Sequence, residues 1–65
     1  MKIKIIKANS TSYWYAPEDE NQIGNIFEVE RHFWKPAGEE KYRVMSGNYA
    51  EEYYIDLDDV EIIGE

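Results

Sequence analysis

The acidic side chains and one histidine are the groups through which this chain of 65 residues could perform acid–base chemistry. It contains fourteen Asp and Glu residues, a single histidine (His32) and no cysteine. Nucleophilic catalysis needs a hydroxyl or thiol beside a base, and phosphate chemistry uses a glycine-rich loop, but neither motif occurs here. A carboxyl group acts as a general acid only where burial or crowding raises its pKa, and nothing in the sequence locates such a group. We therefore predict that the protein is not an enzyme and has no catalytic residues.

Four acids near the end of the sequence superficially resemble a calcium-binding loop: Asp56, Asp58, Asp59 and Glu61. An EF-hand loop also needs a glycine at its sharp turn and a bidentate glutamate at its twelfth position, and both are missing. With one histidine and no cysteine, His-rich and thiolate sites are excluded as well. A short turn with solvated carboxylates explains the pattern, so we predict no metal site and no cofactor.

Aromatic residues are the second group that indicates a function, because they favour contacts with other proteins. The chain has six Tyr, two Trp and two Phe, and many stand next to polar, loop-like segments. Consecutive residues of an extended segment point to opposite sides, so some of these rings must lie near solvent. Trp and Tyr are enriched in binding hot spots, and the predicted protein-binding residues are Tyr13, Trp14, Tyr15, Phe33, Trp34 and Tyr54. The alternative is that these rings merely cover the ends of a small core.

Negative charge is concentrated in the second half of the chain. The net charge is −7, and residues 51–61 hold six acids and no base. These acids form the predicted acidic face: Glu51, Glu52, Asp56, Asp58, Asp59 and Glu61. The face either keeps the domain soluble or imitates the phosphates of a nucleic acid and so competes for a basic groove. Direct nucleic-acid binding is not expected, because phosphate contacts need basic side chains.

Alternating apolar residues predict that these groups are positioned by short strands in one domain, residues 1–65. We expect strands at 1–7, 26–31, 41–45, 52–55 and 60–63, and no pattern of helical period persists. Between them we expect a long loop at 8–22, an irregular stretch at 32–40 and a tight hairpin turn at 46–48 with positive φ at Gly47 or Asn48. A 3₁₀ turn at 56–59, capped by Asp56, should precede the last strand.

The strand pattern predicts an all-β fold, a small five-stranded barrel that leaves no unpaired sheet edge to associate with other chains. Its interior should be filled by six side chains, with bulky rings left over at the rim: Phe27, Val29, Tyr42, Val44, Ile55 and Ile62. A chain this short is only marginally stable without such a core. No run of apolar residues is long enough for a membrane span, and no signal peptide is visible.

Three segments resemble the SH3-like barrel: GNIFEVE at 24–30, KYRVMSGNYAEEYYI at 41–55 as the distal hairpin, and DLDDVEII at 56–63 as the 3₁₀ turn and last strand. The layout is also similar to small uncharacterised proteins of Gram-positive bacteria and their phages and prophages. This resemblance implies a cytoplasmic protein with a phage accessory role, and it brings no catalytic residues. It also implies that the first loop meets the loop after the second strand, so that Trp14 and Trp34 approach each other. The motifs with which eukaryotic SH3 domains bind proline-rich peptides are absent.

These observations predict a non-enzymatic interaction module, encoded by a phage or prophage, that modulates or inhibits a host protein. Its loop aromatics would make the contact, and its acidic face would orient the partner. One alternative is an acidic nucleic-acid mimic that inhibits a DNA-binding protein or nuclease. Another is a self-associating structural subunit, although we expect a monomer or weak oligomer.

Overall fold

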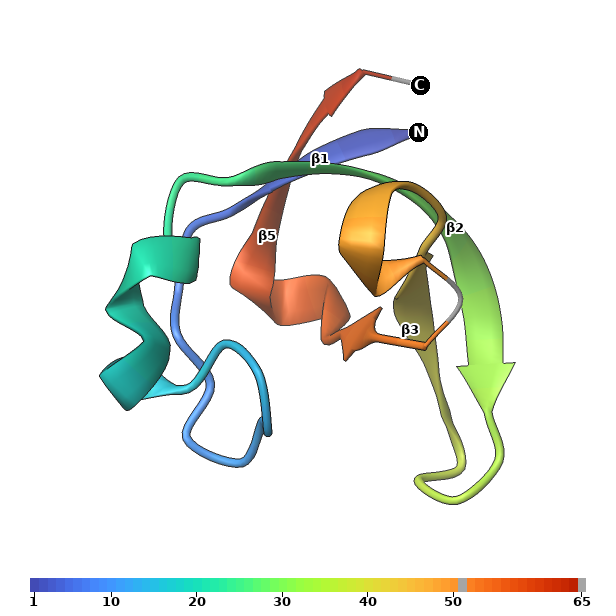
Figure 1. The fold of residues 1–65 in the computed structure, drawn as a ribbon. Helices are drawn as coiled ribbons and strands as arrows, with labels where there is room; N and C mark the ends of the chain where they lie inside the picture. Colours follow the sequence, from blue (N-terminus) through green and yellow to red (C-terminus); the bar gives the residue numbers. More distant parts are fainter. Residues whose placement is uncertain (51, 65) are drawn as a thin grey trace.

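The computed structural model describes residues 1–50 and 52–64, with the backbone alone at 19–21 and 49. Five antiparallel strands form one sheet, as the sequence predicted (Figure 1): β1 (Lys2–Ile5), β2 (Ile26–Trp34), β3 (Glu39–Val44), β4 (Tyr54–Ile55) and β5 (Val60–Gly64). The order in the sheet is β4-β3-β2-β1-β5, so β4 and β5 lie at its two edges and the sheet is not closed. Three short 3₁₀ segments are the helical elements of the described residues: η1 (Pro17–Gln22), η2 (Gly47–Tyr49) and η3 (Leu57–Asp59). Within that part of the chain, no helix has the length and apolar character needed to cross a membrane.

The interior strand β1 shows why the sequence forms a sheet. Its isoleucines alternate with lysines, and Ile3 and Ile5 are fully buried while Lys2 is exposed. β1 pairs with β2 on one side and with β5 on the other, where Ile3 lies opposite Phe27 and Ile62 respectively. Alternation with a period of two therefore gives β1 one core face and one solvated face.

The stretch 32–40, predicted to be irregular, instead contains the tightest hairpin of the fold. β2 continues to Trp34 and β3 begins at Glu39, with Phe33 paired to Glu40 and Trp34 paired to Glu39. The turn between them includes Gly38, whose φ of 67° favours glycine and whose N–H donates to the Trp34 carbonyl at 2.9 Å. Aromatic residues fit a pleated strand well, and this preference outweighs the turn signal of the nearby proline.

The connection from β3 to β4 is longer than the predicted tight turn at 46–48. It runs from Met45 to Tyr53 and contains η2, and β4 is only the two residues Tyr54–Ile55. Gly47 takes the positive φ, at 76°, as one of the two predicted positions. The last turn is also confirmed, since η3 follows Asp56 and leads directly into β5. However, the Asp56 side chain makes no capping hydrogen bond there.

The long first loop, predicted at 8–22, packs Trp14 and Tyr15 against the buried side chains of the strands and ends in η1. Local side-chain hydrogen bonds shape it: the Asn9 Oδ1 accepts from the Thr11 N–H at 2.9 Å, and the Ser12 Oγ accepts from the backbone N–H groups of Trp14 and Tyr15. The Asn9 N–H also donates to the Tyr15 carbonyl at 3.1 Å. Asn and Ser favour such turns, and here the turns direct two aromatic rings inward.

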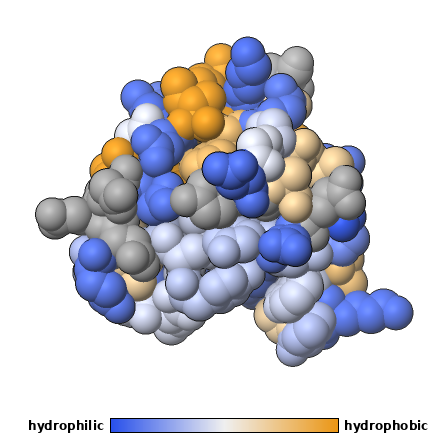
Figure 2. Space-filling view, in the orientation of Figure 1, coloured by the Kyte–Doolittle hydropathy of each residue, from blue (hydrophilic) through white to orange (hydrophobic). Residues whose placement is uncertain are grey.

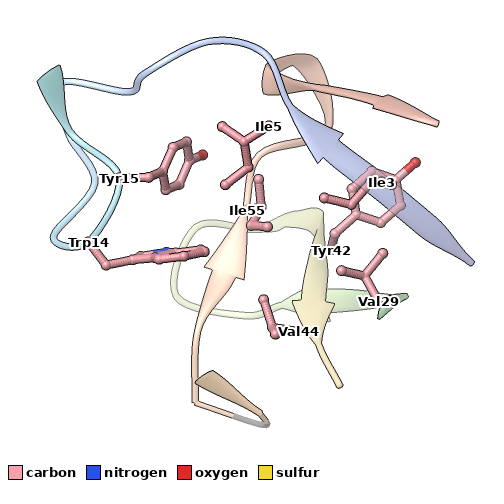
Figure 3. Close-up of a cluster of buried hydrophobic side chains, with 8 residues drawn as sticks. All are labelled: Ile3, Ile5, Trp14, Tyr15, Val29, Tyr42, Val44 and Ile55. Atoms are coloured by element: carbon pink, nitrogen blue, oxygen red, sulfur yellow. The ribbon is translucent and has the colours of Figure 1, made fainter. Parts of the chain in front are cut away.

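The core is built from the sheet and from this loop together. Figure 3 shows Trp14 and Tyr15 reaching from the loop toward Ile55 and Ile5. Eight buried residues form the core: Ile3, Ile5, Trp14, Tyr15, Val29, Tyr42, Val44 and Ile55. Four of the six predicted core residues are confirmed. Phe27 is only partly buried and packs against the cluster. The prediction that Ile62 lies in the core is wrong, because this residue is 50% exposed. Ile62 lies on the edge strand β5, where no further strand covers it.

The exposure of Ile62 gives a first testable prediction. Ile62→Thr should lower the free energy of unfolding by about 0.5 kcal/mol or less, because a half-exposed edge residue contributes little packing. Urea denaturation followed by circular dichroism measures this change. A loss above about 2 kcal/mol is typical of truncating a core isoleucine and would show that Ile62 contributes to the core after all.

Candidate functional site

A hollow of about 180 Å³ is lined by residues of the first loop and of β2, β3 and β4. We call it the aromatic groove, because four rings line it together with five polar or charged side chains: Tyr13, Tyr15, Trp34 and Tyr54, with Asn9, Thr11, Ser12, Lys41 and Asp56. A hollow of this volume is below the usual size of a small-molecule pocket and fits one side chain of a partner.

Strand geometry places two of these rings side by side. Trp34 ends β2 and Tyr54 begins β4, and their ring centroids are 4.3 Å apart at an interplanar angle of 42°. His32, two residues before Trp34 on the same face of β2, brings its ring within 5.7 Å of Tyr54. The strand side of the groove is therefore a preformed aromatic wall.

The loop side of the groove is formed by Tyr13. Its ring is 71% exposed and lies 5.5 Å from the ring of Tyr53, and its hydroxyl donates to the Glu52 carbonyl at 3.1 Å. These contacts hold the ring over the chain that leads into β4. Tyr13 is thus an exposed ring in a defined position, which suits a contact residue.

The structure moves two predicted binding residues into the core. Trp14 is 5% exposed and Tyr15 is 2% exposed, so neither has the exposed ring that the prediction required, although an edge of Tyr15 reaches the groove. The Trp14 indole N–H donates to the Tyr54 carbonyl at 3.0 Å, which satisfies its polar atom. The strands of so short a chain supply too little apolar surface, and loop aromatics complete the core instead.

The expected approach of Trp14 to Trp34 is replaced by a different pairing of loop and strand. Tyr13, rather than Trp14, faces the groove that Trp34 lines. Phe33 is 55% exposed but lies on the opposite face of β2 from Trp34, outside the groove. Of the six predicted contact residues, the structure therefore brings three exposed or half-buried rings together: Tyr13, Trp34 and Tyr54.

A polar network beneath the groove ties the loop to η3. The Tyr15 hydroxyl donates to the Asp59 Oδ2 at 2.7 Å and accepts from the Asp56 N–H at 3.0 Å. The Asn9 amide donates to Asp56 at 2.6 Å and to Asp59 at 2.9 Å, and Lys41 pairs with Asp56 and, at 3.4 Å, with Glu39. The Oδ2 atom of the buried Asp59 carboxylate thus accepts two hydrogen bonds, and the network connects the floor of the groove to the first loop.

This environment shifts two pKa values. Burial raises the pKa of the Tyr15 phenol well above its ordinary value of 10.0. The hydrogen bond from the Asp56 N–H lowers it in part, whereas the hydrogen bond to Asp59 and the neighbouring carboxylates add to the rise. Burial opposes the charge on Lys41, but its hydrogen bonds to Asp56 and Glu39 outweigh burial and raise its pKa. Both groups therefore keep their protons at neutral pH, Tyr15 as a neutral donor and Lys41 as a cation.

The predicted acidic face does not form one uniform surface. Asp59 is buried at 4% exposure, which corrects its placement among solvated carboxylates, and Asp56 is half-buried and paired with Lys41. Glu52, Asp58 and Glu61 are exposed, and Glu51 lies outside the described residues. Figure 2 shows one face of the molecule as mostly hydrophilic, with strongly hydrophobic residues near its upper edge and a smaller hydrophobic spot at the left.

The residues that sequence reasoning missed are Asn9, Ser12 and Lys41. The run Asn-Ser-Thr-Ser at 9–12 is a signal for local side-chain turns, but nothing in it indicates which distant carboxylates Asn9 would meet. Lys41 stands in an alternating strand and has no local signal at all. Among the described residues, no cluster of three or more His, Asp or Glu side chains is arranged to hold a metal ion.

Comparison of the chain with known proteins gave no match to a family model, to a curated protein or to a solved structure. The geometry of the aromatic groove is therefore the principal basis for assigning a function.

Proposed function

We propose that this chain is a non-enzymatic protein-interaction module that binds its partner through the aromatic groove. The observation that carries the proposal is the convergence of Tyr13, Trp34 and Tyr54 around a hollow sized for one side chain. Trp and Tyr supply large contact areas at a low cost in side-chain entropy, and a preformed wall of rings lowers that cost further.

The proposal includes an SH3-like architecture. The element order supports it: a long first loop, a sheet ordered β4-β3-β2-β1-β5, and a 3₁₀ turn directly before the last strand. The long strand β2 pairs with β1 at its start and with β3 toward its end, so it bends from one part of the sheet into the other. The first loop and residues of β2, β3 and β4 frame the groove.

We further propose, from the resemblance alone, that the module acts in the cytoplasm on a host protein and is encoded by a phage or prophage. The groove supports the binding part of this proposal, because it supplies a contact surface without a reactive group. The nucleic-acid mimic remains an alternative hypothesis. It predicts that binding depends on exposed Glu52, Asp58 and Glu61 and not on the aromatic rings.

Trp34→Ala tests the proposal. We expect affinity for the captured partner to fall by about tenfold to several hundredfold, as for a typical aromatic hot spot. The measurement is capture of partners from a cell lysate by the immobilised domain, followed by titration of the main captured protein. Phe33→Ala is the matched control, because it removes an exposed ring on the neighbouring residue that lies outside the groove. Equal affinity of the native domain and Trp34→Ala would refute the proposal.

A further inference from the structure

The aromatic groove adjoins a second hollow whose walls are acidic. This second hollow has a volume of about 490 Å³ and shares Asn9 and Asp56 with the groove. Its other charged walls are Lys7, two glutamates at the start of β3 and two aspartates of η3. Across the two hollows, carboxylates outnumber lysines five to two. A partner segment that fills the groove therefore extends over a surface of negative potential.

The neighbouring cations leave part of this charge unbalanced. Lys41 is shared between Asp56 and Glu39, so one positive charge serves two carboxylates. Glu40 has an exposed ion pair with Arg31 at 3.3 Å, which contributes little and is easily exchanged. Asp58 is exposed and forms no ion pair within the described part of the chain. Glu39, Glu40 and Asp58 are thus available to a cation brought by a partner.

The groove itself also favours a cation near its rings. The faces of Trp34 and Tyr54 carry negative quadrupole potential, which attracts guanidinium and ammonium groups. The aliphatic stem of arginine packs well on such rings while its guanidinium binds carboxylates in a bidentate manner. Arginine suits both surfaces better than lysine, which offers only a compact point charge.

Extending the proposed function, on which this inference rests, we infer that the groove binds a basic segment of its partner. An apolar side chain or an arginine stem occupies the aromatic groove, and an arginine close to it in sequence pairs with Glu39, Glu40 or Asp58. Charge complementarity carries the choice of partner: the chain has a net charge of −7, and the second hollow is predominantly acidic.

A random heptapeptide display library, selected against the full chain, tests the inference. The enriched peptides should contain arginine beside an aromatic or aliphatic residue, and fluorescence anisotropy should show binding that weakens as ionic strength rises. The triple variant Glu39→Gln, Glu40→Gln and Asp58→Asn should bind these peptides about tenfold more weakly.

The control triple variant Glu18→Gln, Glu30→Gln and Glu61→Gln changes net charge equally at exposed residues outside both hollows. It should keep the native affinity apart from a small general effect of charge. If both triple variants bind alike, if the enriched peptides lack basic residues, or if none is enriched, the inference is overturned. In the first two cases, loss of binding in Trp34→Ala would still support the proposed function. Native affinity of Trp34→Ala would remove the proposed function and the inference with it.

Discussion

Trp14→Ala is expected to unfold the domain or bring it to the edge of unfolding. Truncating a buried tryptophan to alanine typically costs about 3–5 kcal/mol. A single core in a domain of fewer than about 70–80 residues rarely supplies more than about 3–5 kcal/mol in total. Trp14 is 5% exposed and makes edge-to-face contacts with Tyr15, Phe27 and Tyr53 at centroid distances of 5.1–5.5 Å. The whole stability of the protein is thus comparable to the loss.

Urea denaturation, together with the dispersion of backbone amide NMR signals, measures this effect. Trp34→Ala is the matched comparison, because it removes the same ring type from the rim of the groove. It should cost clearly less than Trp14→Ala, because Trp34 is only partly buried. Its pair with Tyr54 contributes about 0.5–1.5 kcal/mol in addition to the area that the ring buries. The two substitutions should therefore separate stability, which depends on Trp14, from binding, which depends on Trp34. A Trp14→Ala variant that unfolds cooperatively with less than about 1 kcal/mol of lost stability would contradict the core described here.

The second large effect is a loss of stability at alkaline pH, caused by Tyr15. Its pKa in the folded protein is raised above the ordinary value of 10.0, first because its ring is buried. The hydrogen bond from the Asp56 N–H opposes this rise, but the hydrogen bond to Asp59 and the charges of Asp59 and Asp56 add to it. Above pH 10 the unfolded chain releases this proton and the folded protein retains it, so the unfolded state is favoured. The contribution of Tyr15 to the free energy of unfolding should be constant below pH 10. It should fall by about 1.4 kcal/mol per pH unit between pH 10 and the raised pKa of the folded protein.

Tyr15→Phe checks the origin of this alkaline loss. The variant should be less stable at pH 7, because Asp59 loses a hydrogen bond and the Asp56 N–H loses its acceptor. Its stability should nevertheless decline less steeply above pH 10, as urea denaturation at a series of pH values measures. Tyr13→Phe is the control: burial also raises the Tyr13 pKa, but its ring is 71% exposed and water can solvate the phenolate, so the slope should change less. An unchanged slope in Tyr15→Phe would assign the loss to other groups.

Much of the sheet follows from local sequence patterns. Alternation of isoleucine with lysine in β1, and the inward positions of Val29, Tyr42, Val44 and Ile55, are confirmed because period-two patterning directly determines which face is buried. The 3₁₀ turn after Asp56 and the positive φ at Gly47 are likewise local preferences that the fold keeps. The strand boundaries are predicted less accurately. Pro36 indicates an early end of the second strand, but β2 continues to Trp34 because it pairs with β3 up to that residue.

The candidate site depended on contacts that no local pattern specifies. Three consecutive aromatic residues indicate that some rings are buried and others exposed, yet only the folded loop decides that Trp14 and Tyr15 fill the core while Tyr13 lines the groove. The same holds for Asn9, which meets Asp56 and Asp59 across 47 and 50 residues of sequence. Composition and alternation determined an acidic, all-β domain rich in aromatics. The tertiary structure decided which rings and carboxylates remain accessible, because burial depends on packing between segments distant in the chain.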